Sequence, residues 1–350
     1  MRPSDSESPT FGRSGDDFVA GICQQVQAWS TQPALTELVE MFGGSPPAGD
    51  LPTRLALLDE FSKVWDYRGR ARASATGRLH SQDAAGAVRW LIPRLDLPAT
   101  QLEQITALAS ELGLVTATTP EGADFDHILV IGGGRYTNQL RVGYAREMAT
   151  GRRIGQVVLA AASRQLLESE LDAVAVCAPG ARTEFELLVA AAKDVLGLDT
   201  GEVTAHIRQR VDNPQRDRAV WSFPPEGNDL GVPVMLLETP SPDPDNRRAN
   251  SADTYTFAAQ TARMHQSTCL LVTGQPVVPY LHFEGLRTLA LPLRIHLESA
   301  GFGIDRYNRL SNLDQQHPAK LLQEVRSTIR SARALMDRVA ITGRGPNSAG

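Results

Sequence analysis

Apolar residues recur at every third or fourth position through the first third of the chain. Between Phe18 and Trp29 this spacing places the apolar side chains on one face of a helix, and Asp16 and Asp17 suit its cap. The same spacing returns in three further segments, at residues 33–42, 51–65 and 99–114. We therefore predict that the N-terminal third is helical.

From about residue 125 continuous apolar runs alternate with helical segments. We expect strands at 127–134, 155–162, 172–178, 232–238, 268–274 and 293–299. Helical spacing is found at 135–149, 183–197, 251–265, 280–290 and 318–339. Apolar strands that alternate with helices are typical of a parallel sheet covered on both faces. The sequence predicts an α/β protein, a Rossmann-like parallel sheet with helices on both faces, preceded by a helical N-terminal extension.

These patterns divide the chain into segments of different character. We predict a disordered leader (1–15), a helical extension (16–120), a Rossmann-like α/β domain (125–304), a C-terminal helical segment (305–340) and a flexible tail (341–350). Whether the helical extension contacts substrate is left open at this point.

Composition narrows the classes of partner. The net charge of −5 gives no general attraction to nucleic acid, so DNA is not an expected partner. A basic segment, Asp66 to His80, is either a solvated loop or an arm that contacts phosphates. The N-terminus lacks the apolar core of a signal peptide, and no apolar run is long enough for a membrane span. With three widely spaced cysteines, these features predict a cytoplasmic protein without membrane contact.

A glycine triplet, Gly132, Gly133 and Gly134, ends the first expected strand. Glycines at the carboxyl end of a strand allow the backbone to approach a ligand, and the following helix start favours an anion. The triplet matches neither the dinucleotide-binding fingerprint nor the P-loop. A plain tight turn is the alternative reading.

The polar loop before the helix at 251 is longer than a connection needs. Asn250 or Ser251 would cap that helix, and Asp253 lies in its first turn. Capping alone explains these residues, but loops at the carboxyl ends of parallel strands are also where ligands bind. We expect substrate contacts from Asn250 and Ser251.

The strand 268–274 has an unusual exit, in which Thr273 and Gln275 precede a proline-stiffened loop. His282 and Arg287 follow on the next helix, and each is either a structural residue or part of a site. Glu184 opens another helix, where it is either a dipole partner or a proton acceptor. No histidine spacing supports a metal site, and no serine-hydrolase elbow occurs.

Taken in order, these motifs resemble the SanA-like and YdcF-like family known as domain-of-unknown-function 218. The glycine triplet followed by Arg141, the acidic helix start at Glu184, the Asn250–Asp253 helix start and the Leu-Val-Thr strand with His282 and Arg287 carry the resemblance over residues 125–304. The family implies a Rossmann-like sheet and a nucleotide-like or adenosyl ligand. More loosely, the chain is similar to actinobacterial aminoacyl-tRNA-dependent transferases of antibiotic biosynthesis, such as the valanimycin-pathway seryl transferase.

The resemblance leads to three functional hypotheses. The first is a group-transfer enzyme of specialised metabolism that moves an aminoacyl group from an aminoacyl-tRNA to a small nucleophile. The second is a nucleotide- or S-adenosylmethionine-binding protein without strong catalysis, and the third is a phosphoester-processing enzyme. Under the first, Glu184, Asp253 or His282 would handle the proton, as catalytic residues. Substrate would be held by Gly132, Gly133, Gly134, Arg141, Asn250, Ser251, Thr273, Gln275 and Arg287.

Overall fold

The computed structural model describes residues 18–70, 92–134, 136–209, 216, 218–310 and 317–343. The expected leader, the cap at Asp16 and Asp17, most of the basic segment (from residue 71 onward) and the end of the tail lie outside the described residues.

A six-stranded sheet forms the centre of the α/β part, in the order β3-β4-β2-β1-β5-β6. The strands are β1 (Asp124–Ile131), β2 (Arg153–Ala162), β3 (Ala219–Phe223), β4 (Val234–Thr239), β5 (Thr268–Gly274) and β6 (His296–Phe302). Neighbouring strands from β4 to β6 pair in parallel, whereas β3 pairs antiparallel with β4 at the edge. The chain moves outward from β1 to β4 and then crosses to β5, which places a topological switch point beside β1. The expected α/β fold is confirmed.

Helices cover both faces of this sheet, as successive side chains of a strand point to opposite faces. Ile128 and Val130 of β1 pack into the core under α7 (Thr137–Ala149), α9 (Glu184–Leu196) and α10 (Gly201–Arg208). Leu129 and Ile131 face the other core, under α11 (Ser251–Thr261) and α12 (Val278–Gly285). The shorter elements are η2 (Pro225–Gly227), the π turn η3 (Leu286–Ala290), α13 (Leu291–Leu293) and α14 (Asp305–Leu310).

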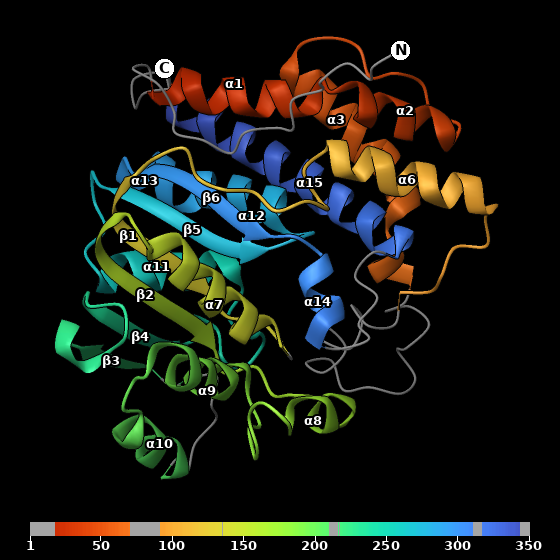
Figure 1. Ribbon diagram of the computed structural model, residues 1–350. Coiled ribbons are helices and arrows are strands. Elements are labelled where there is room, and N and C mark those ends of the chain that lie inside the picture. Colours follow the sequence, from red (N-terminus) through yellow and green to blue (C-terminus); the bar gives the residue numbers. More distant parts are fainter. Residues whose placement is uncertain are drawn as a thin grey trace.

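The N-terminal helices form a further layer together with the C-terminal helix (Figure 1). They are α1 (Phe18–Ser30), α2 (Pro33–Met41), α3 (Leu51–Phe61), η1 (Ser62–Trp65) and α6 (Ala99–Glu111). The 26-residue α15 (Pro318–Gly343) packs against α3, η1 and α6 on one side and against α12 on the other. Ile22, Val26 and Trp29 of α1 are fully buried, so the predicted apolar face lies in the core.

Local sequence explains where several helices begin and end. The Asp50 side chain accepts a hydrogen bond of 3.0 Å from the Thr53 N–H and caps α3. Thr183 caps α9 in the same way, and α9 ends at Gly197 in the left-handed conformation. α9 begins at Glu184, and the Glu184 side chain lies beside the ends of β1 and β2, at the carboxyl edge of the sheet.

One expected strand is absent, and one observed strand was not expected. The run 172–178 is not a strand: its first half belongs to α8 (Glu168–Val174), whose Val174 packs on α9, while Val176 is 85% exposed. The edge strand β3 was not expected, because its exposure alternates and no continuous apolar run marks it. The last strand is present but begins at His296, three residues later than expected. The helix after β5 is also present and begins at Val278, two residues earlier than expected.

Candidate functional site

A pocket of about 290 Å³ opens at the carboxyl edge of the sheet. It is enclosed by the end of β1, the end of β2, the start of α11 and the first turn of α12, which is where parallel α/β sheets bind ligands. The described residues that line it are Arg68, Ile131, Gly132, Gly133, Gly134, Arg141, Ala161, Ala162, Arg164, Glu184, Arg248, Ala249, Asn250, Ser251, Thr254, Val277, Tyr280 and Leu281.

The glycine turn forms the floor of this pocket. A Cβ on Gly132 would lie 2.4 Å from the Cβ of Ala161, so only glycine fits between β1 and β2 at this point. The N–H of Gly133 donates to Asn138 Oδ1 at 2.8 Å, and Asn138 Nδ2 in turn donates to the Glu184 carbonyl at 3.1 Å. The turn is therefore fixed to the starts of both α7 and α9.

Arg141 supports the turn from α7. Its side chain is buried, and Nη1 donates to the carbonyls of Ile131 at 2.6 Å and Gly132 at 3.0 Å. These bonds place a guanidinium charge directly under the glycine turn. Arg141 thus shapes the pocket floor and also makes it electropositive.

Arg164, just after β2, joins two carboxylates at the pocket wall. Its guanidinium forms a bidentate pair with the fully buried Glu170, at 2.9 and 3.0 Å, and its Nε lies 2.8 Å from Glu184 Oε1. Burial alone would lower the pKa of Arg164, but the two carboxylates outweigh it and raise that pKa. The pairing holds Glu184 in a fixed orientation at the pocket.

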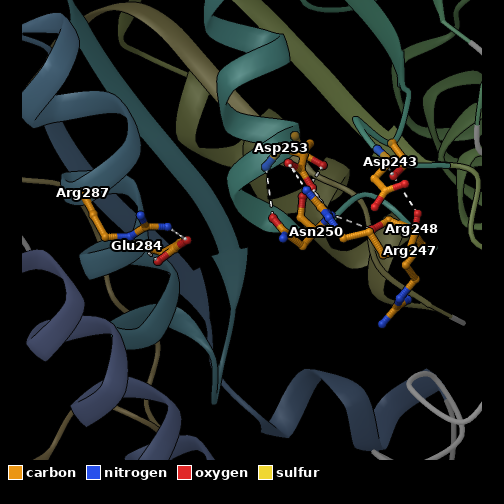
Figure 2. Close-up of polar contacts among 9 residues, drawn as sticks. Asp243, Arg247, Arg248, Asn250, Asp253, Glu284 and Arg287 are labelled. Atoms are coloured by element: carbon orange, nitrogen blue, oxygen red, sulfur yellow. Dashed lines mark hydrogen bonds and ion pairs between the residues drawn. The ribbon is translucent and has the colours of Figure 1, made fainter. Parts of the chain in front are cut away.

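The start of α11 is held by a network around Asp253 (Figure 2). Asn250 Oδ1 accepts from the Asp253 N–H, and Asp253 Oδ2 accepts from the Asn250 N–H at 2.8 Å, which is a reciprocal capping box. Arg247 adds a bidentate pair to Asp253, at 2.5 and 3.0 Å. Burial raises the pKa of Asp253, but the bonds from Arg247 and Asn250 outweigh it and leave the pKa below its ordinary value. Arg248 and Ser251 are thereby presented to the pocket on either side of the cap.

The structure brings together seven of the residues that the sequence suggested for a site. Gly132, Gly133, Gly134, Arg141, Glu184, Asn250 and Ser251 all line the pocket. Asp253 is near it but is engaged by Arg247 and the cap. Thr273 is fully buried at the end of β5, and Gln275, also buried, donates from Nε2 to the Thr116 carbonyl at 2.9 Å.

His282 and Arg287 are not brought to the pocket. His282 is fully buried between α1 and β6, where its ring nitrogens lie 2.8 Å from Ser299 Oγ and 2.7 Å from Gln25 Oε1. Arg287 pairs with Glu284 one turn away, at 2.5 Å (Figure 2). The helix after β5 begins earlier than expected, and its pocket-facing residues are Tyr280 and Leu281.

Five polar lining residues were not among the predicted site residues: Arg68, Arg164, Arg248, Thr254 and Tyr280. Arg164 follows β2 directly, and Arg248 and Tyr280 lie within segments already marked as strand exits, so their position at carboxyl ends was the available signal. Arg68 belongs to the basic segment of the helical extension, and no sequence pattern shows that this segment reaches the sheet.

A smaller cavity of about 50 Å³ adjoins the pocket. The two share Gly133, Gly134, Arg141 and Val277 as lining residues. The remaining lining residues of the small cavity are Ile92, Thr137, Gln275, Pro276, Tyr307, Lys320 and Glu324. The glycine turn therefore lines both spaces, and the smaller one is bordered by α15.

Within the ranges that the structure covers, no three His, Cys, Asp or Glu side chains gather as a metal site would require. In those same ranges no helix combines the length and apolar character that crossing a membrane demands.

Comparison with known proteins places the chain in a family. Uncharacterized protein Rv3785 of Mycobacterium tuberculosis is 61% identical over 331 residues, which are 93% of this chain and 92% of the relative. Uncharacterized protein Mb3814 of Mycobacterium bovis shows the same identity and coverage. The chain belongs to the Rv3785 family. No solved structure matches it significantly.

The family model that matches, Rv3785 N-terminal domain, covers residues 13–113. Among the described residues this region contains α1, α2, α3, η1 and α6. It also contains Arg68, which lines the pocket at the sheet. The N-terminal domain of the Rv3785 family and the α/β part therefore meet at the candidate site.

Proposed function

We propose that this protein binds a small phosphate-bearing molecule of the nucleotide type in the pocket and uses it in a group-transfer reaction. One observation carries the proposal: the described residues lining the pocket include four arginines and a single carboxylate, and positive charge remains in excess when Glu170 and Glu324, which pair with Arg164 and Arg68 from behind the lining, are counted. Such a balance favours an anionic ligand, because opposite charges attract strongly where water is partly excluded.

The backbone adds to this preference for an anion. The first N–H groups of a helix have no intrahelical partner and carry the positive end of the helix dipole. At α11 the cap engages the N–H of Asp253, while Ser251 lies at the pocket. Together with the glycine turn before α7, this gives two helix starts at one site, as phosphate groups prefer.

The same charges help to choose between the ligand classes. S-adenosylmethionine carries a sulfonium cation, which the arginines would repel. A nucleoside phosphate or sugar phosphate places its negative charge where Arg248 and the floor over Arg141 are positive. A volume of about 290 Å³ lies near the lower end of the roughly 300–1,000 Å³ that is usual for ligand sites. A single small molecule, or the end of a larger one, is therefore the fitting occupant.

Group transfer requires that the donor be positioned, its developing charge neutralised and a proton accepted. Arg248 and the start of α11 would neutralise charge, and Glu184 is the carboxylate available at the pocket wall to accept the proton. Arg164 holds that carboxylate at 2.8 Å. Transfer of an aminoacyl group from tRNA, in antibiotic-type metabolism, is a finer prediction within this proposal, with the aminoacylated end as occupant.

The first experiment is calorimetric titration with AMP, glucose 1-phosphate, inorganic phosphate, S-adenosylmethionine and adenosine. The wild-type protein is expected to bind a phosphate ester and to bind adenosine at least tenfold more weakly, since a charge-assisted hydrogen bond contributes about 1.5–3 kcal/mol. Arg248→Ala should weaken the phosphate ester about tenfold. Arg153→Ala removes an exposed arginine paired with Asp124 at the opposite end of β2 and should change nothing.

Catalysis is tested separately, by mass spectrometry of ligands incubated with the protein and with a candidate amine or alcohol acceptor. Charged tRNA is included as one donor. Glu184→Gln should retain the ligand and lose turnover. If no phosphate ester binds to the wild type, or if Arg248→Ala and Arg153→Ala behave alike, the proposed function is wrong.

A further inference from the structure

Among the described lining residues, Arg68 is the one most distant in sequence from the others, which lie between residues 131 and 281. It belongs to the N-terminal domain of the family, yet it shares the pocket with the glycine turn and with Arg248. Its side chain is 29% exposed, so it is only partly buried.

Two contacts with α15 fix Arg68 in this place. Its backbone N–H donates to Gln323 Oε1 at 2.7 Å, and its guanidinium pairs with the Glu324 carboxylate. The Glu324 side chain is only 6% exposed. Holding both the main chain and the side chain reduces the conformational entropy that Arg68 would lose on binding a ligand.

The ion pair also lies between the two cavities. Arg68 lines the larger pocket and Glu324 lines the smaller cavity beside it. A ligand anion in the pocket therefore approaches a cation whose charge is partly balanced by the carboxylate behind it. Anion and carboxylate compete for the same guanidinium.

We propose that Arg68 is a ligand-binding arginine, contributed by the N-terminal domain to the pocket of the α/β part, and that Glu324 limits its attraction for the ligand's anionic group. This inference rests on the proposed function, because it needs an anionic ligand in the pocket. It gives the N-terminal domain a role in recognition, with the phosphate of the bound ester as the group recognised.

The test measures the affinity for whichever phosphate ester binds to the wild-type full-length protein. Arg68→Gln should weaken it about ten- to a hundredfold, which is typical for loss of a charged hydrogen-bond donor. Arg68→Lys should weaken it less, since lysine keeps the charge but not the forked geometry. Arg70→Gln is the matched control: Arg70 is exposed, lies over the Tyr67 ring and is not among the lining residues.

Glu324→Gln is expected to act in the opposite direction. It removes the competing charge while its amide oxygen can still accept a hydrogen bond from Arg68, so affinity should rise severalfold. Opposite changes in affinity for Arg68→Gln and Glu324→Gln are what the proposal requires. Arg68→Gln and Glu324→Gln each break the same ion pair, so a purely structural role would weaken binding in both variants.

The outcomes separate this inference from the function on which it depends. If the wild type binds no phosphate ester, both are overturned. If the wild type binds and Arg248→Ala weakens binding, but Arg68→Gln stays within twofold of Arg70→Gln, only the role of Arg68 is overturned. Circular dichroism and melting temperature of each variant establish that the fold is retained; if Arg68→Gln fails to fold, Arg68→Lys and Glu324→Gln still give the comparison of signs.

Discussion

At the scale of single residues, His282 joins three elements without reaching solvent. Gln25 Oε1, 2.7 Å from Nε2, can only accept, so Nε2 carries the proton and donates to it. Nδ1 then accepts from the Ser299 hydroxyl at 2.8 Å. Burial disfavours the charged imidazolium and lowers the pKa of His282 to about 3. The neutral ring ties α12 to α1 and β6.

This gives a pH dependence of stability with a definite sign. The folded pKa of about 3 lies below the ordinary value of 6.5, so between these limits the unfolded chain binds one more proton than the folded one. The free energy of unfolding should fall by about 1.4 kcal/mol for each pH unit below about 6 on account of this residue. Urea unfolding at pH 7, 6, 5 and 4.5 measures it.

His282→Gln removes the titrating group and is the reference for that experiment. Its stability at pH 7 should be lower, because buried contacts are lost, but it should decline less steeply toward pH 4.5. Parallel curves for the two proteins would mean that His282 is protonated in the folded state and that the assigned hydrogen bonds are wrong.

At the scale of elements, α11 shows how a helix start is held for ligand contact. The reciprocal bonds of Asn250 and Asp253 close the first turn, and Arg247 clamps Asp253 from the preceding loop. The Ser241 hydroxyl donates to the Arg247 carbonyl at 2.6 Å, so the loop is also closed on itself. The polar loop is longer than a connection needs because its contacts hold Arg248 and Ser251 at the pocket.

Asp253→Ala should therefore affect both stability and binding. We expect a loss of about 1–2 kcal/mol in the free energy of unfolding at neutral pH, from the cap and the charged hydrogen bonds. Because the pKa of Asp253 is lowered from 3.8, this contribution is present above that pH and is lost as pH falls through the folded value. Affinity for the phosphate ester should fall as well, because Arg247 loses its ion pair with Asp253 and the adjacent Arg248 is then held less firmly at the pocket.

Asp172→Ala is the control for that variant, because Asp172 is an exposed acid in α8. Its effect on stability should stay within about 0.5 kcal/mol. Equal losses in the two alanine variants, or unchanged ligand affinity in Asp253→Ala, would show that the clamp does not position the site.

The elements that sequence predicted well are those whose pattern is local. The glycine turn, the cap of α11 and strands such as β5 each carry their signal within a few residues. The strand expected at 172–178 failed because a short apolar run does not distinguish a strand from a helix that packs one side on α9. For the site, the contribution of Arg68 depends on contacts with Gln323 and Glu324, more than 250 positions away, and no local pattern contains them.

At the scale of the whole molecule, one hydrophobic core crosses the boundary of the N-terminal domain. Trp29 of α1 and Leu38 of α2 belong to the same buried cluster as Leu271 of β5 and Val325 of α15. Ion pairs add to this, because the buried Arg326 of α15 lies 3.8 Å from Asp59 and 3.6 Å from Asp66 of the N-terminal domain. The helical layer and the sheet layer therefore stabilise one another through α12 and α15.

We predict a single cooperative unfolding transition for the two parts. Calorimetry should give a van't Hoff enthalpy equal to the measured one. The three tryptophans left in a Trp221→Phe variant, Trp29, Trp65 and Trp90, all belong to the N-terminal domain, so its fluorescence reports on that domain. The midpoint should coincide with that of far-UV circular dichroism. Two separate transitions, or a fluorescence midpoint that precedes the other, would show that the N-terminal domain unfolds independently.

The position of α15 in the chain has a consequence for synthesis. α1, α3 and α6 emerge from the ribosome first, yet the helix that they pack against follows more than 200 residues after α6. At about 5–20 residues per second the apolar faces of these helices would wait roughly 10–40 s for their partner. During that time these apolar faces lack the contacts that α15 supplies. α15 thus completes the buried core of helices that precede it in the chain and, through Gln323 and Glu324, sets Arg68 in place.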